Sequence, residues 1–462
     1  MHAISKPRSI QQAAVRNQVQ TADSYRFFNL LTAPELLDAV EDFLPAHRER
    51  LFPPTETLSM FLAQALSDDR SCQKAVNDAA IKRACGGLRL CSTRTGAYCR
   101  ARQRLPLEMV SSLAKYTGRL VDEQVSEEWR WQGRPVRLID GTTVTMPDTP
   151  ANQLAFPQQG AQKPGLGFPI CRIVGVTCLS SGVVLNAAMG RFSGKGGNEQ
   201  TLLRELLDTF AAGDVVLGDS FYCTYFLIAT LQARSVDVLF EQHGARKRCT
   251  DFRTGKKLGP RDHQVEWPKP ATRPDWMTQA QYDAAPDSIA VRELEAGGKV
   301  LVTSLLCANI APKPALKALY RSRWHVELDL RSIKTTLGME TLSCKTPDMN
   351  EKELWVYLLA YNLIRLLMAS AASLSSILPR QLSFKHTLQL WLAWSQQQRS
   401  CGDENHVQVL MLLIAQRRVG NRSGRMEPRA VKRRPKPFPL LMTPRPVARQ
   451  DIIKNGHPKK VK

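Results

Sequence analysis

VRLIDGTTVTM, residues 136–146, is the first β-branched run in a chain whose earlier part is helical, and it sets the architecture that follows. Its Val, Ile and Thr residues favour a strand, and Asp140 ends the apolar part of the run with Gly141 beside it. Two further runs, ICRIVGVTCL (170–179) and GVVLNAAMGRF (182–192), are separated by a Ser-Gly turn that predicts a β-hairpin. We therefore expect three neighbouring strands.

The next hundred residues alternate between helical and strand patterns. An amphipathic run at 199–210 precedes the strand DVVLGD at 214–219, and a helical run at 224–233 precedes the strand VDVLF at 236–240. This order predicts a mixed sheet flanked by helices, an α/β (α+β) fold. From 242 to 305 turn formers and basic residues dominate, and RELEAGG with KVLVTSL predicts a closing hairpin. We interpret this segment as a β-rich insertion within the sheet domain.

Helical patterns precede the sheet region. TLSMFLAQAL (57–66), CQKAVNDAAIKRA (72–84) and TRTGAYCRARQRL (93–105) predict three helices, with Ser92 as the N-cap of the third. The third run carries four candidate DNA-binding arginines: Arg94, Arg100, Arg102 and Arg104. They favour a DNA-contacting domain, and the alternative is a helical bundle whose arginines form a solvated face.

Further helices are predicted at 314–337, 351–372 and near 386–397. The apolar run from Trp355 to Leu374 contains Asn362 and Arg365, so we interpret it as a buried core helix and not a membrane span. The expected organisation is a helical N-terminal DNA-binding domain at 1–125, a catalytic domain at 130–345, C-terminal helices at 346–416, and a Pro/Arg-rich tail at 417–462. That tail is expected to be extended or disordered until bound.

The charge of the chain favours nucleic acid as its partner. Among 462 residues, 64 Lys and Arg outnumber 42 Asp and Glu, for a net charge of +22. The tail from Arg417 to Lys462 holds 15 basic and 2 acidic residues, a net charge of +13. Such an excess favours DNA over a membrane surface. The first residues lack the apolar core of a signal peptide, so we expect a cytoplasmic protein, nucleoid-associated when bound to DNA.

Two aspartates stand in matched contexts. Asp140 in LIDGTT and Asp219 in VVLGDSFY each follow an apolar β run, at a predicted strand end. Two carboxylates at the ends of neighbouring strands make a metal site plausible. Taken singly, each could instead be an N-cap or turn aspartate.

The run LYRSRWHVELDLRSIKTTLG, 319–338, predicts an amphipathic helix with a polar stripe. At about 100° per residue, four side chains fall within an arc of about 60°: Tyr320, Arg323, Glu327 and Lys334. An ordinary solvated face with i,i+4 ion pairs is the alternative. Trp324, beside the stripe, could stack on a base or pack in the core, and Arg331 is a further candidate DNA contact.

These residues suit the transfer of a DNA phosphodiester. Two Mg²⁺ ions about 3.5–4 Å apart can activate the nucleophile, stabilise the leaving oxygen and neutralise the phosphorane. Asp140 would bridge the ions, and Asp219 and Glu327 would complete one each. Arg323 and Lys334 would bind phosphate, and Tyr320 would hydrogen-bond the DNA backbone near the cleaved end.

On these residues the chain resembles bacterial transposases of the insertion sequence four family. Their helix signature Y-x2-R-x3-E-x6-K is matched by Tyr320, Arg323, Glu327 and Lys334, which accompany the DDE triad. The stretches DGTTVTMPDT, VVLGDSFY, AYNLIR and KRRPKPFPLL also resemble the family, as does the helical N-terminus. The resemblance covers nearly the whole chain.

The resemblance implies an RNase H-like catalytic fold with an insertion between Asp219 and Glu327. It implies two Mg²⁺ ions, for which Mn²⁺ substitutes, and cut-and-paste DNA transposition. In that reaction a homodimer binds terminal inverted repeats of double-stranded DNA, cleaves them and joins the 3′-hydroxyl ends to target DNA. Some members form a hairpin whose flipped base stacks on tryptophan, and Trp324 and Trp267 are the residues to consider.

Two other functions stay open at this point. A nuclease of the same fold without strand transfer would carry the same carboxylates. A domesticated DNA-binding derivative would have lost catalysis, although the intact triad and signature argue against it. No membrane partner is expected.

Overall fold

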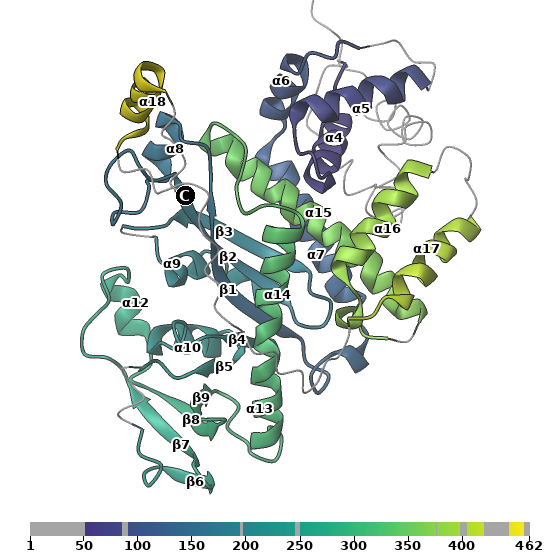
Figure 1. Ribbon diagram of the computed structural model, residues 1–462. Helices are drawn as coiled ribbons and strands as arrows, with labels where there is room; N and C mark the ends of the chain where they lie inside the picture. The colour runs from purple at the N-terminus through teal and green to yellow at the C-terminus, as the bar shows by residue number, and fades with distance from the viewer. Residues whose placement is uncertain are drawn as a thin grey trace, which may run out of the picture.

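A nine-stranded mixed sheet forms the centre of the computed structural model, which describes residues 51–85, 91–194, 197–244, 250–375, 377–397, 404–419 and 443–456. The strand order is β3-β2-β1-β4-β5-β9-β8-β7-β6 (Figure 1). The strands are β1 (Val136–Thr145), β2 (Ile170–Cys178), β3 (Val184–Arg191), β4 (Val215–Gly218), β5 (Asp237–Glu241), β6 (Lys256–Gly259), β7 (Asp262–Pro268), β8 (Ser288–Ala296) and β9 (Lys299–Thr303). The predicted mixed sheet with helices is confirmed.

The strands of the central sheet pair as the sequence pattern indicates. β1 is antiparallel to β2 and parallel to β4, which is parallel to β5. The predicted hairpin joins β2 to β3, and Gly182 in its turn has a φ of +81°, which glycine adopts without strain. The predicted β8–β9 hairpin is also present, and β9 pairs with β5, so β6 to β9 extend the same sheet.

Helices cover both faces of the sheet (Figure 1). They are α4 (Pro54–Leu66), α5 (Cys72–Cys85), α6 (Gly96–Arg104), α7 (Leu107–Glu123), α8 (Pro150–Ala155), α9 (Glu199–Arg204), α10 (Tyr225–Ala233), α12 (Gln279–Ala284), α13 (Lys313–Arg321), α14 (His325–Arg331), α15 (Pro347–Leu374), α16 (Phe384–Gln397), α17 (Glu404–Gln416) and α18 (Arg445–Asn455). In Figure 1, α9 and α10 lie on one side of β1, and α14 and α15 lie on the other.

Several local predictions need correction. Ser92 is not the N-cap of α6, because that helix begins after Thr95, and the Ser92 hydroxyl instead accepts a hydrogen bond from the Arg94 amide at 3.2 Å. The helix α17 was not predicted. Part of the basic tail, expected to be extended, forms α18, where Arg445 pairs with Asp148 at 2.5 Å. Residues 420–442 and 457–462 of the tail, and residues 1–50, lie outside the described residues.

The run 319–338 is not one regular α-helix, which corrects the helical-wheel prediction. α13 ends at Arg321, a 3₁₀ turn spans Ser322–Trp324, α14 follows, and a π-helical segment spans Ser332–Thr336. A 3₁₀ turn advances more than 100° per residue and a π turn advances less. The uniform step of about 100° assumed for the helical wheel therefore does not hold from Tyr320 to Lys334.

Helix α15 is a core helix. It is long and apolar enough to cross a membrane by length and composition, but 94% of its most apolar window is buried inside the protein. Its Asn362 joins three elements. The Asn362 amide nitrogen donates to the carbonyls of Ala114 in α7 and Val184 in β3, and its oxygen accepts from the Val184 amide. This side chain therefore holds α15, α7 and the edge of the sheet together.

We expect Asn362→Ala to lower the free energy of unfolding by about 2–4 kcal/mol, because it leaves buried main-chain groups without partners. Thermal melting of the full chain measures the effect. Asn77→Ala, at an exposed position in α5, is the control and should melt like the wild type. Equal melting temperatures for the two variants would contradict the role assigned to Asn362.

Candidate active site

The parallel pairing of β1 with β4 ends two residues before Asp140 and Asp219. The paired residues Val136 and Val215 are 79 residues apart in sequence, and so are the two aspartates. Continuing the register two residues beyond the last pair, Leu138 with Leu217, sets Asp140 beside Asp219. Neighbouring strands lie about 4.8 Å apart, so the two carboxylates share one location.

The alternation of side chains along each strand decides which face of the sheet Asp140 and Asp219 occupy. Val136 and Leu138 of β1 and Leu217 of β4 pack in one apolar cluster with residues of α13 and α14. Since side chains two apart point the same way, Asp140 and Asp219 lie on the face that α13 and α14 cover. β1 continues past Asp140 to Thr145 because β2 pairs with it throughout, so Asp140 lies within the strand and not at its end.

A third acid, Glu241, lies beside these two aspartates, and we call Asp140, Asp219 and Glu241 the acid row. The β4–β5 register pairs Leu217 with Leu239, which places Glu241 opposite Asp219. Glu241 is bound by Lys299 at 2.6 Å and accepts a longer hydrogen bond, 3.4 Å, from the Tyr320 hydroxyl. Sequence reasoning missed Glu241, although its position at the end of VDVLF matches that of Asp219 after DVVLG.

Burial raises the pKa of Asp140 to about 6. The Gly141 amide, which donates to Asp140 Oδ1 at 2.8 Å, and the Arg323 guanidinium lower this pKa, whereas the nearby carboxylates of Asp219 and Glu199 raise it. Like charges close together in a partly buried place favour a proton or a cation between them. Cationic groups are therefore attracted to this part of the sheet.

Asp219 also has the local role that the alternative interpretation suggested. Its Oδ1 accepts a hydrogen bond from the Phe221 amide at 2.8 Å, as a turn aspartate does. The second oxygen is not used by that turn. A turn role and a role in the acid row are therefore compatible.

Glu199 lies next to Asp140 from the opposite face of the sheet. A Cβ on Gly141 would come within 2.5 Å of the Glu199 Oε1, so only glycine lets this carboxylate approach. Arg172 pairs with Glu199 at 3.2 Å, and the Tyr222 hydroxyl donates to it at 3.2 Å. Glu199 was not predicted, because its proximity depends on the packing of α9 against β2 and β3.

Two of the signature residues, Arg323 and Tyr320, lie near the aspartates. Arg323 pairs with Glu327 at 3.0 Å, and its charge also acts on Asp140. Burial raises the pKa of Tyr320, and the carboxylate of Glu241 raises it further. The ion pair between Arg323 and Glu327 has the i,i+4 spacing of the alternative interpretation, but it lies above the acid row and is only partly exposed.

The chemistry of the donors fits a hard divalent ion, since Asp140, Asp219 and Glu327 offer carboxylate oxygens. In the part of the chain that the structure describes, however, no three His, Cys, Asp or Glu side chains stand close enough to hold one ion together. The Glu327 carboxylate is instead engaged by the Arg323 guanidinium at 3.0 Å.

The remaining predicted residues of this helix differ in exposure. Trp324 is 57% exposed, so it does not pack in the core. Arg331 is exposed as well. Lys334 is half-buried in the π-helical segment. Trp267 is only 2% exposed and donates to Glu293 at 2.8 Å, so it is not available for stacking on a base.

The four candidate DNA-binding arginines of the N-terminal region also differ in exposure. Arg94, Arg100 and Arg104 are exposed on or beside α6. Arg102 is 7% exposed, with its guanidinium 4.6 Å from the centre of the Phe61 ring, which contradicts the predicted DNA contact. Helical periodicity turns this arginine towards α4.

Comparison with known proteins places the chain in a family. The family model described as "Transposase DDE domain" matches residues 131–363. The chain is 31% identical over 360 residues to the transposase InsG for insertion sequence element IS4 of Escherichia coli (strain K12), covering 74% of this chain and 77% of that protein. A cryo-EM structure of the piggyBac transposase synaptic complex with hairpin DNA is similar with a TM-score of 0.42 and 10% identity, covering 86% of this chain and 87% of that one.

The matched family region contains β1, β4 and α14, and with them the acid row and the signature helix. With the family model spanning half of the chain and the relative three quarters of it, the chain belongs to the DDE transposases of the IS4 family.

Proposed function

We propose that the protein catalyses cut-and-paste transposition of an insertion sequence. It would bind the terminal inverted repeats of double-stranded DNA, hydrolyse a phosphodiester at each end and join the 3′-hydroxyl ends to target DNA. The observation that carries the proposal is the register that sets Asp140 beside Asp219 under the helix of Glu327. We also propose that β1 to β5 with their helices form an RNase H-like core.

Asp140, Asp219 and Glu327 are the proposed metal-binding residues. Two Mg²⁺ ions, or Mn²⁺ in their place, would supply the Lewis acidity and the activated oxygen that phosphodiester transfer needs. Asp140, whose pKa is raised to about 6 by burial, is the proposed bridging residue. Glu199 supports the site from behind, where its charge acts on Asp140.

Arg323 is proposed to have two partners. In the structure its guanidinium neutralises Glu327 and acts on Asp140. An arginine released from that pair can bind a phosphate with two hydrogen bonds. Exposed Trp324 and Arg331, together with Lys334, would extend this contact along the DNA end.

The other proposed contacts lie farther from the acids. Tyr320, which donates to Glu241, would hydrogen-bond the DNA backbone only after leaving that partner. Exposed Arg94, Arg100 and Arg104 would bind duplex phosphates from the N-terminal helices. We propose that the active form is a homodimer on paired transposon ends, as simultaneous processing of two ends requires.

With Mg²⁺ and duplex DNA taken from the flanks of the gene, the wild type should nick the ends. Asp140→Ala, Asp219→Ala and Glu327→Ala should each lower the rate by about a thousandfold or more, because each removes a metal ligand. Denaturing gels give the rates. Asp208→Ala, at an exposed aspartate, should nick normally. Nicking at the wild-type rate by all three triad variants would overturn the proposed site.

Replacement of Arg323 by alanine should weaken binding of end DNA and reduce the slope of log K against log salt by about 0.9, the value for one phosphate contact. Fluorescence anisotropy at several KCl concentrations measures both quantities. Arg234→Ala, which removes an exposed arginine paired with Asp208, should leave the slope unchanged. An unchanged slope for Arg323→Ala would show that this residue does not contact phosphate.

The metal-free protein should be stabilised by Asp140→Asn at pH 7.5. The folded pKa of Asp140, about 6, exceeds its ordinary value of 3.8, so ionisation opposes folding and stability falls as pH rises from about 4 through 6. Asparagine removes this cost, at most about 3 kcal/mol. Melting in EDTA between pH 4.5 and 7.5 tests it: the variant's advantage should grow with pH, and a constant difference would contradict the assignment.

A further inference from the structure

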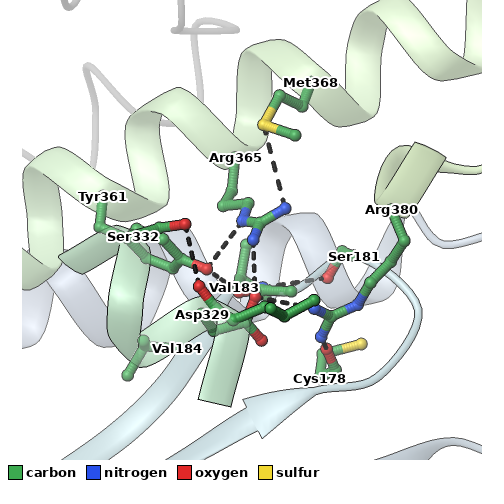
Figure 2. Close-up of polar contacts among 12 residues, drawn as sticks. Cys178, Ser181, Val183, Val184, Asp329, Ser332, Tyr361, Arg365, Met368 and Arg380 are labelled. Carbon is green, nitrogen blue, oxygen red and sulfur yellow. Dashed lines mark hydrogen bonds and ion pairs between the residues drawn. The ribbon is translucent and has the colours of Figure 1, made fainter. Parts of the chain in front are cut away.

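Asp329 lies two residues after Glu327 on α14, and it points away from the acid row into the core. It is fully buried. Its Oδ1 accepts from the Arg365 Nη2 at 2.6 Å and from the Arg380 Nη1 at 2.7 Å (Figure 2). Two residues along an α-helix turn the side chain by about 200°, so Glu327 and Asp329 act on opposite sides of one short helix.

The two arginines connect Asp329 to other parts of the fold. Arg365, on α15, donates from Nε to the Tyr361 hydroxyl at 2.8 Å, and that hydroxyl donates to the Gly182 carbonyl in the β2–β3 turn. Arg380 donates to two main-chain carbonyls at the end of β2, at 2.5 and 2.9 Å. Figure 2 shows both guanidiniums converging on Asp329 above this turn.

The turn is shaped for this contact. A Cβ on Gly182 would lie 2.8 Å from the Arg365 guanidinium carbon, so glycine permits the approach as well as the positive φ. One buried carboxylate thus joins α14 to α15, to the segment of Arg380 and to the β2–β3 hairpin. The AYNLIR stretch supplies Tyr361 and Arg365 to this network.

Helix α14 needs such an external attachment. It has seven residues, with a 3₁₀ turn before it and a π-helical segment after it. The 3₁₀ turn and the π-helical segment are continuous with α14 but depart from α geometry, so the direction of the helical run can change on either side of α14. Its orientation must therefore come from tertiary contacts, of which the Asp329 network is the charged and most deeply buried one described above.

We propose that Asp329, Arg365 and Arg380 form a positioning unit that orients α14, so that Glu327 stays on the face of Asp140 and Asp219. The proposal rests on the proposed metal-binding role of Glu327. None of the three residues touches substrate or metal. They act through Glu327, and they couple its position to the C-terminal helices.

Titration of the full-length protein with Mn²⁺ alone, followed by calorimetry, tests the unit. Asp329→Asn should weaken Mn²⁺ binding about tenfold, the low end of the cost of removing a residue that orients a ligand, while binding of end DNA stays unchanged. Arg380→Lys keeps the charge but cannot bond the carboxylate and both carbonyls together. Arg380→Lys should therefore show a smaller loss of Mn²⁺ affinity than Asp329→Asn. It tests the proposal if Asp329→Asn fails to fold.

The matched control is Asp262→Asn. Asp262 pairs with the buried Arg292 at 2.6 Å in the β7–β8 part of the sheet, away from α14. This variant breaks an equally buried ion pair and should lower the melting temperature without changing Mn²⁺ affinity. The same loss of affinity in Asp262→Asn and Asp329→Asn would mean that general destabilisation is the cause, and would overturn the proposal.

A double-mutant cycle separates this inference from the proposed function. In a Glu327→Gln background, Asp329→Asn should cause no further loss of Mn²⁺ affinity, because the ligand it positions is gone. A full additional loss overturns the positioning role. If Glu327→Gln alone leaves Mn²⁺ binding unchanged, the metal-binding role of Glu327 fails.

Hydrogen exchange of the main-chain amides of residues 325–336 then tests the positioning role independently of metal binding. It must be faster in Asp329→Asn than in the wild type and unchanged in Asp262→Asn. Wild-type exchange in a folded Asp329→Asn variant overturns the proposal, whatever the metal titrations show.

Discussion

The parallel pairing of β1 with β4 is the constraint on which the rest of the site depends. Because side chains alternate along a strand, one register decides both which apolar residues pack under α13 and α14 and which face the following acids occupy. A slip of one residue would turn Asp219 to the other face and expose Leu217. Hydrophobic packing therefore holds Asp140 and Asp219 together, although their charges repel.

Glu327, the third residue of the proposed triad, is positioned in a different way. No strand register places Glu327. A short helix carries it, and the buried Asp329 network attaches this helix to the core. The pair of Glu327 with Arg323 lies within the same helical run. Arginine charge compensates the acids on both sides of α14, which limits the electrostatic cost of gathering carboxylates in a partly buried place. The same arginines explain why a strongly basic protein can have an acidic centre.

Patterns local in sequence predicted β1 to β5, the two hairpins and most helices correctly, because period-two alternation and turn residues act between near neighbours. They did not predict β6 and β7 as strands. Predictions that needed a side chain's environment were less reliable. Arg102 has the composition of a DNA contact but stacks on Phe61 in the core. Trp267 is buried, and the wheel for 319–338 assumed a regular helix that the 3₁₀ and π segments interrupt.

By itself, the sequence determined the mixed α/β class, the family signature and the strand contexts of Asp140 and Asp219, since each is written in a continuous run of residues. Only the tertiary structure decided that Glu199 and Glu241 join them and that Asp329 is bound by two distant arginines. Those contacts link residues tens of positions apart, through sheet register and helix packing, and no local pattern encodes the distance between such side chains.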